Sequence, residues 1–151
     1  MTALAANRLV NIVNEHIGFV IDLPMGASET IYKGAFVSLD AGDQFGAPLA
    51  AGEVFIGLAL EKVASAATNG ADTIKVLVGG QFQQALASIA QADIGKVAFA
   101  SDDNVLTLVK TSNSCVGRIV NVPATGTCIV QMKTPGEVSG AVGTTYTASA
   151  L

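Results

Sequence analysis

The sequence predicts an all-β protein, a compact sandwich or barrel of the jelly-roll-like kind. Three observations lead to this fold class. Short runs of β-branched and aliphatic residues recur along the chain, bounded by Gly, Pro, Asn and Asp. Within several runs apolar and polar residues alternate, as in 105–109, where the leucines face one side and Thr107 the other. The length of 151 residues suits one domain with its own core.

Each expected element follows from this pattern. The strands are expected at 16–23, 35–39, 54–62, 73–78, 96–100, 105–109, 115–122 and 127–133. Turn-forming residues separate them at 41–43, 69–70, 102–104 and 123–126. The segment 83–93 (QQALASIAQAD) fits either a helix or a loop, because its apolar positions match a helical period only loosely.

A weak internal duplication runs through the middle of the chain. The first copy spans 33–78 and the second spans 94–132. Each has a strand led by glycine, a polar turn, a strand with an apolar–glycine pair (Ile56-Gly57 and Val116-Gly117) and a return strand. Two similar β units in tandem bury their apolar faces against each other, which favours a sandwich or barrel.

The two ends differ from the domain expected at 16–133. Residues 1–15 are rich in alanine and then turn apolar, which predicts an N-terminal arm, either a short helix or an extended segment. Residues 134–151 hold mostly Gly, Ser, Thr and Ala, which predicts a flexible C-terminal tail. Frayed termini are the alternative for both. The residues expected to bind a partner are Leu9, Val10, Ile12 and Val13.

The sequence offers no constellation of catalytic, cofactor-binding or metal-binding residues, so we expect no enzyme and no cofactor. His16 is the only histidine, and a nucleophilic triad needs a histidine base. With Cys115 and Cys128 as the only cysteines, no zinc pattern forms, and two reduced core thiols are expected. Neither a phosphate-binding P-loop nor a dinucleotide GxGxxG motif is present. The acidic residues of 102–104, and Asp40 with Asp43, are expected to serve tight turns.

Composition limits the partners. The net charge is −4 and basic residues are scattered, which argues against nucleic acid. No apolar run reaches the roughly 20 residues of a spanning helix, and the N-terminus does not resemble a signal peptide, so no membrane partner is expected. Half of the residues are nevertheless hydrophobic and only 13% are charged. We expect other subunits to cover part of this apolar surface.

Five stretches carry a family resemblance: YKGAFVSLDAG, AAGEVFIGLALEKVASAA, GADTIKVLVGGQFQQALAS, ADIGKVAFASDDNVLTLV and SCVGRIVNVPATGTCIVQMK. Over residues 32–133 the chain resembles the small capsid decoration, or cement, proteins of tailed phages. More closely, it is similar to the short phage head proteins once loosely labelled recombinase-like. The missing P-loop does not support the recombinase label.

The resemblance implies a structural virion protein on the outer surface of a mature bacteriophage capsid, assembled in the host cytoplasm. Its partners would be the major capsid protein and itself, as a homotrimer by preference and a dimer otherwise. Two alternatives stay open. Another virion β-protein, such as a tail-tube or head-fibre component, would share this composition. A trimeric all-β nucleotide hydrolase would need clustered Asp, Ser and Arg, whereas the chain has only two arginines, Arg8 and Arg118.

Overall fold

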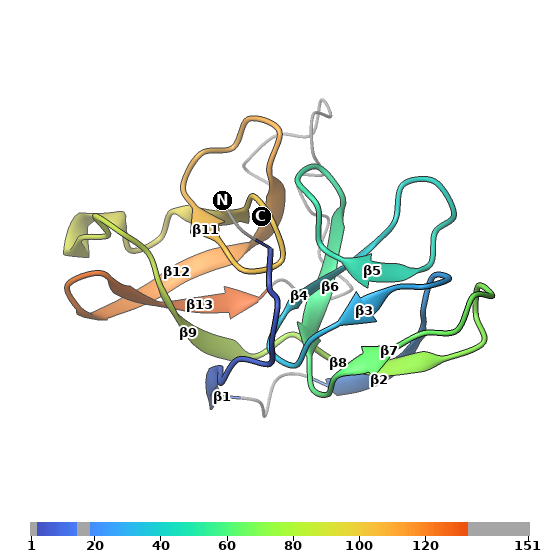
Figure 1. The fold of residues 1–151 in the computed structure, drawn as a ribbon. Helices are drawn as coiled ribbons and strands as arrows, with labels where there is room; N and C mark the ends of the chain where they lie inside the picture. The colour runs from blue at the N-terminus through green and yellow to red at the C-terminus, as the bar shows by residue number, and fades with distance from the viewer. Residues whose placement is uncertain (1–2, 15–18, 133–151) are drawn as a thin grey trace.

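The computed structural model of the chain describes residues 3–14 and 19–132, and it confirms the all-β prediction (Figure 1). All strand pairs are antiparallel and form three sheets in a sandwich-like arrangement. Within the described residues no sheet closes into a barrel, so the sandwich is the correct alternative of the two. No helix in this part of the chain is long and apolar enough to cross a membrane.

The strands divide among the sheets as follows. The six-stranded sheet has the order β1 (Asn11–Asn14), β9 (Gln81–Ala85), β13 (Thr127–Met132), β12 (Ser114–Ala124), β10 (Val97–Ala100) and β11 (Leu106–Thr107). The five-stranded sheet has the order β2 (Phe19–Pro24), β8 (Thr73–Val78), β6 (Val54–Ala59), β4 (Phe36–Leu39) and β5 (Gly46–Pro48). The two-stranded sheet pairs β3 (Thr30–Ile31) with β7 (Val63–Ala64).

Every strand expected from the sequence is present, with small changes at its ends. The strand at 73–78 has the expected bounds, whereas 105–109 shortens to the two residues of β11. The strand expected at 16–23 is described from Phe19 onward as β2, since 15–18 lie outside the described residues. The short strands β1, β3, β5 and β7 were not expected. They have few residues, so their alternating pattern is weak.

The helical alternative for 83–93 is wrong. Residues 83–85 belong to β9, which pairs with both β1 and β13. A loop follows, and the only helical turn in the described chain is the 3₁₀ turn η1 (Gln91–Asp93). Glutamine and alanine have low strand propensity, but Phe82 is fully buried in the core and the flanking glutamines pair on both sides. Tertiary pairing therefore overrides the local preference here.

The predicted duplication appears as a repeated strand order. In the first unit (19–78) the order is β5-β4-β6-β8-β2, and in the second unit (81–132) it is β11-β10-β12-β13-β9. Matching backbone bonds accompany this order. The Gly34 N–H donates to Ala59 O at 2.8 Å, and the Gly95 N–H donates to Ile119 O at 2.8 Å. Both glycines have positive φ, 86° and 92°. The two units therefore fold alike despite their weak sequence similarity.

Two apolar clusters form the core. The larger one joins both units, because Phe36, Phe55, Leu58 and Leu77 of the first unit pack with the buried face of the six-stranded sheet. The Phe36 ring stands edge-on to the rings of Phe55 and Phe82, at centroid distances of 5.9 and 5.7 Å. The smaller cluster includes Met25, Ile31 and Val37 and belongs to the first unit.

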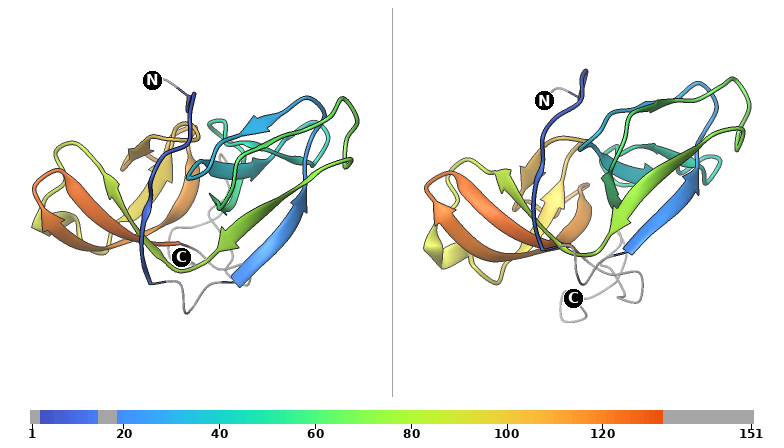
Figure 2. Two further views of the ribbon diagram at one scale, coloured as in Figure 1. Left: turned by 60° about the horizontal axis from the view of Figure 1, so that its bottom comes forward. Right: turned by 90° about the horizontal axis from the view of Figure 1, so that it is seen from below.

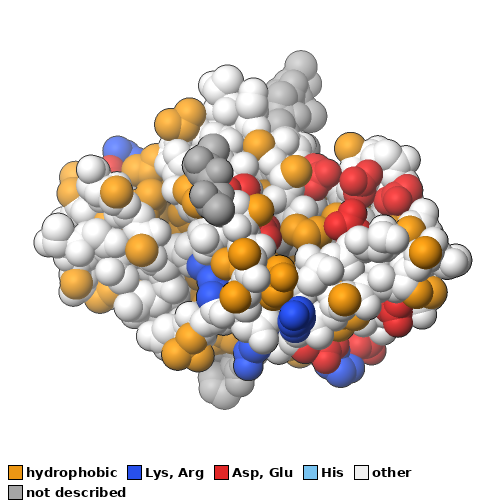
Figure 3. All heavy atoms as spheres, viewed as in Figure 1, with side chains coloured by type: hydrophobic (Ala, Val, Ile, Leu, Met, Phe, Trp, Pro, Cys, Tyr) orange, Lys and Arg blue, Asp and Glu red, His pale blue; other side chains and the backbone are white. Residues whose placement is uncertain are grey.

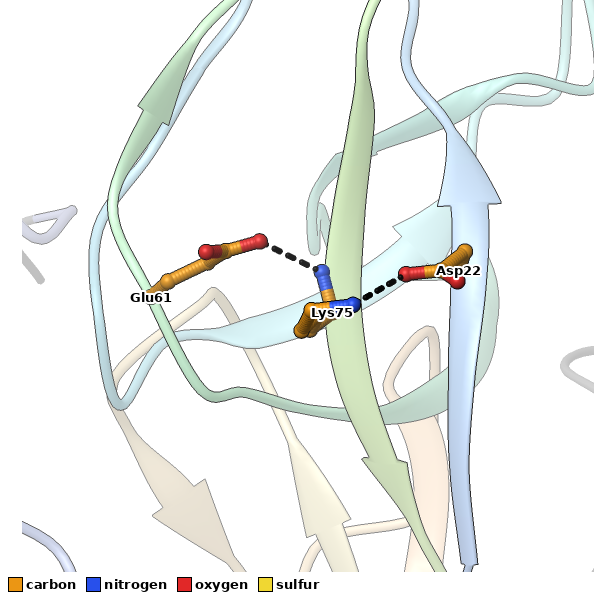
Figure 4. A network of polar contacts seen from close by, with 3 residues as sticks. All are labelled: Asp22, Glu61 and Lys75. Carbon is orange, nitrogen blue, oxygen red and sulfur yellow. Dashed lines mark hydrogen bonds and ion pairs between the residues drawn. The ribbon is translucent and has the colours of Figure 1, made fainter.

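An exposed polar network ties the edge strand β2 to its neighbour (Figure 4). The Lys75 ammonium lies 2.9 Å from Asp22 Oδ1, and the Lys75 backbone N–H donates to Glu61 Oε1 at 3.1 Å. The hydrogen bond to Asp22 raises the pKa of Lys75. Both side chains of the ion pair are more than half exposed, so the pair contributes little to stability.

Candidate interaction site

The N-terminal residues 3–12, called the N-terminal strap below, run across the face where the two units meet (Figures 1 and 2). The strap ends in β1, which pairs with β9 of the second unit. None of its residues is fully buried. From residue 8 its side chains alternate: Arg8, Val10 and Ile12 are half-buried, while Leu9 is 94% exposed. The strap is thus an extended segment with one inward and one outward side.

Backbone and side-chain hydrogen bonds attach the strap to both units. The Leu4 N–H donates to Asp103 Oδ1 in the second unit at 2.9 Å. In the first unit the Lys33 N–H donates to Asn7 Oδ1 at 3.1 Å, and Lys33 O accepts from the Arg8 N–H at 2.9 Å.

The Arg8 guanidinium is the central contact of the strap. Its Nε donates to Gly34 O at 2.7 Å, and its Nη1 donates to Gln84 Oε1 at 2.6 Å. The guanidinium carbon lies 5.2 Å from the centroid of the Phe36 ring, within cation–π range. Nη2 is buried without a hydrogen-bond partner among the described residues. Burial lowers the pKa of Arg8, an effect that the Asp103 carboxylate partly opposes.

Glycine at position 34 makes this close approach possible. A Cβ there would lie 2.7 Å from Arg8 Cγ and 2.9 Å from Val10 Cγ2, closer than van der Waals contact allows. The equivalent Gly95 of the second unit also has positive φ, but a Cβ there would meet nothing within 4 Å. Among the residues that the structure describes, a segment therefore lies across the glycine of the first unit and not across that of the second.

Two open hollows flank the strap. The larger, about 490 Å³, lies toward the second unit and is lined by residues that include Gln83, Gln84, Leu86 and Asn104. The smaller, about 210 Å³, lies toward the first unit, and Lys33, Gly34, Leu58 and Leu60 are among its lining residues. Arg8 and Leu9 border both. Aliphatic side chains, glutamine amides and the half-buried Arg8 side chain therefore form the surface on the two sides of the strap.

The four residues expected to bind a partner do not all face the solvent. Leu9 points outward, whereas Val10 and Ile12 pack against the larger core cluster. Val13 lies in β1, and its side chain is not among those described. The tail expected at 134–151 and His16 lie outside the described residues.

Sequence reasoning missed Arg8 and Gly34 as the contacts that position the strap. The one available signal was a lone arginine within an otherwise alanine-rich and aliphatic arm. Gly34 was noted only as the glycine that leads a repeated strand, and its close contact with Arg8, 26 residues away, was not indicated by the sequence.

The other candidate residues have structural roles. Asp40 Oδ1 accepts from the Gly42 N–H at 2.6 Å, and Asp102 Oδ1 accepts from the Asn104 N–H at 2.8 Å, so both serve turns as expected. Asp103 differs from the expectation, because its buried Oδ1 accepts from the Leu4 N–H of the strap. Cys115 and Cys128 are buried and form no disulfide, and burial raises the pKa of Cys128 to about 11. No group of three metal-ligating side chains occurs among the described residues.

Acidic side chains gather over the part of the molecule formed by the five-stranded sheet (Figure 3). Partial burial, together with the charges of Asp40, Asp43 and Glu53, raises the pKa of Glu29. Glu53 Oε2 accepts from the Ser38 hydroxyl at 2.5 Å, so this carboxylate is already engaged within the fold.

No protein-family model matches this sequence, and no curated protein matches it significantly.

Proposed function

We propose that this chain is a structural virion protein that binds the outer surface of a mature phage capsid and stabilises contacts between major capsid proteins. The resemblance of residues 32–133 to capsid decoration proteins supports the assignment. The composition supports it as well, because half of the residues are hydrophobic while only 13% are charged. A protein that binds only the mature shell stabilises that shell by mass action.

The observation that carries the proposal is the exposure of Leu9 between the two hollows. A leucine that is 94% exposed on an anchored segment is a preformed apolar contact for a partner. Its complete burial stabilises a contact by roughly 1.5–3 kcal/mol. That energy is modest for one copy, but several linked copies bind through multivalency. In this proposal the partners are the major capsid protein and further copies of the chain, with a trimer favoured.

Co-sedimentation with capsids tests the proposal. Empty mature shells and unexpanded procapsids are assembled from the major capsid protein of the same phage, and each is pelleted with the purified protein. We expect binding to the mature shells alone. Leu9→Asp should weaken that binding roughly tenfold or more, since it removes the apolar contact and buries a charge. Val109→Asp is the matched control, because Val109 is 59% exposed and does not line either hollow.

The outcomes separate this function from its alternatives. Absence of binding to either shell contradicts the proposal. Rings or filaments formed by the protein alone, seen by electron microscopy, would instead indicate a tail-tube component. Equal losses for Leu9→Asp and Val109→Asp would show that the strap is not the attachment site.

A further inference from the structure

The site beneath the N-terminal strap recognises an arginine that comes from outside its own sheets. Gly34 O, Gln84 Oε1 and the face of Phe36 converge on the Arg8 guanidinium. These groups belong to the first unit and to β9 of the second, and they are separated from Arg8 by 26 to 76 residues in sequence. The contacts of Arg8 therefore depend on groups that are distant in sequence and not on the residues next to Arg8.

The second unit has an equivalent glycine carbonyl, and no strap lies across it among the described residues. Gly95 O, the counterpart of Gly34 O, accepts from Arg118 Nη1 at 2.6 Å. Arg118 lies on β12 of the same unit, so this unit supplies its guanidinium internally. At the equivalent position of β6 the first unit has Leu58, which is buried in the core. In the first unit, the guanidinium at this carbonyl comes from another segment of chain, the strap.

We propose that this site is an interaction surface for the N-terminal strap of a second copy of the chain, so that copies exchange straps as they assemble. The inference deepens the proposed function, because it identifies the contact by which the subunits associate. The strap of another copy carries the same Arg8, Val10 and Ile12 and makes the same contacts. Exchange of identical elements is a low-cost route to association.

The strap is suited to exchange because its hydrogen bonds and apolar contacts leave it partly exposed along its whole length. None of its residues is fully buried, and hollows of about 490 and 210 Å³ border it on two sides. The β1–β9 pairing that follows it includes an irregularity between Ile12 and Asn14. Segments with few buried contacts open locally at the low end of a protein's stability range.

Engineered disulfides distinguish exchange from attachment within one chain. Asn11 pairs with Gln83 across β1 and β9, and their side chains are joined by a 3.3 Å hydrogen bond. Residues opposite each other in antiparallel strands have the roughly 4.4–6.8 Å Cα separation that a disulfide requires. Chains carrying only Asn11→Cys are co-expressed with differently tagged chains carrying only Gln83→Cys and then oxidised. We expect a covalent dimer that contains both tags.

Two controls accompany this experiment. Asp22→Cys chains co-expressed with Lys75→Cys chains place the same chemistry across β2 and β8, which stay within one chain, so no mixed dimer is expected. Gly34→Ala should lower the yield of the strap-linked dimer roughly tenfold, because it removes the space for Arg8 and loosens hydrogen bonds made by a charged group. Gly95→Ala has the same positive φ but an open environment, and should leave the yield unchanged.

The proposal is overturned if the mixed single variants stay monomeric while a chain carrying both cysteines closes only on itself. Co-sedimentation of that closed chain with capsids distinguishes a failure of strap exchange from a failure of the proposed capsid binding. If the mixed single variants stay monomeric and the closed chain still binds mature shells, strap exchange is wrong and capsid attachment stands. If exchange occurs but shells are not bound, self-association remains and the capsid assignment fails.

Discussion

At the scale of single residues, the most unusual group is the Asp103 carboxyl. Asp103 is only 2% exposed, and its Oδ1 accepts the Leu4 N–H of the strap while its backbone carbonyl accepts the Phe36 N–H of the first unit. One residue of the second unit thus contacts both the strap and the first unit. Burial raises the pKa of Asp103, and the nearby Arg8 charge only partly offsets this effect.

The raised pKa predicts a specific dependence of stability on pH. Between the ordinary value and the raised value the folded protein binds more protons at Asp103 than the unfolded chain does. The contribution of Asp103 to the free energy of unfolding therefore falls as the pH rises from below 3.8 through the raised pKa. Asp103→Asn keeps an acceptor for Leu4 but cannot ionise. We expect it to gain stability relative to the unmodified protein as the pH rises from 3.8 to 7.

Urea titrations of both proteins at several pH values measure this difference. Asp22→Asn controls for the loss of one negative charge, because it removes that charge from a side chain that is 62% exposed. A stability difference for Asp103→Asn that is independent of pH would contradict the prediction.

At the scale of elements, the duplication places one glycine of each unit at the same irregularity. The register of β4 against β6 shifts between Val37↔Gly57 and Ser38↔Phe55. The register of β10 against β12 shifts between Ala98↔Gly117 and Phe99↔Cys115. At both positions the neighbouring strand passes so closely that an added Cβ would overlap a backbone carbonyl, that of Leu77 or of Gln131. Both units therefore carry the same kind of bulge at a glycine.

Substituting either glycine should therefore destabilise the protein strongly, and by a similar amount in both units. Gly57→Ala and Gly117→Ala should each lower the free energy of unfolding by about 3 kcal/mol or more, because the β6–β8 or the β12–β13 pairing must move apart. Gly126→Ala is the control, since it has positive φ in an open turn and should lose only about 1 kcal/mol. Denaturant titration measures all three. A loss for Gly57→Ala or Gly117→Ala as small as that of Gly126→Ala would contradict this account of the bulges.

At the scale of the whole molecule, the two units are not independent domains. The larger core cluster takes residues from both, and Phe36 at its centre touches rings on β6 and β9. The second unit therefore completes its core with side chains of the first. The smaller cluster gives the first unit additional apolar contacts of its own.

This sharing predicts that both units unfold together. Phe36→Ala should lower the free energy of unfolding by about 3–5 kcal/mol. Hydrogen exchange monitored by mass spectrometry should then show faster opening in peptides from β8 and from β13 alike, because both strands face the shared cluster. Val54→Ala, at a half-exposed position on β6, should change neither the free energy of unfolding nor the exchange of these peptides. Faster exchange confined to the first unit would contradict the shared core.

Much of the fold could be predicted from the sequence because it depends on local chemistry. The alternation in 73–78 identifies β8, and turn residues such as Asp40 and Asp102 mark where strands end. The apolar–glycine pairs Ile56-Gly57 and Val116-Gly117 reveal the duplication, since a close approach between strands allows only glycine there. These signals are carried by a residue and its immediate neighbours.

The tertiary structure decided what depends on distant partners. Gln81–Ala85 is a strand because β1 and β13 pair on either side of it, which no local preference indicates. The alanine-rich and then apolar pattern of the arm does not indicate that Arg8 turns inward to Gly34 and Gln84 while Leu9 turns outward. Which side of an extended segment is buried depends on the surface against which it lies. In this protein that surface is assembled from both units and exists only after they have folded together.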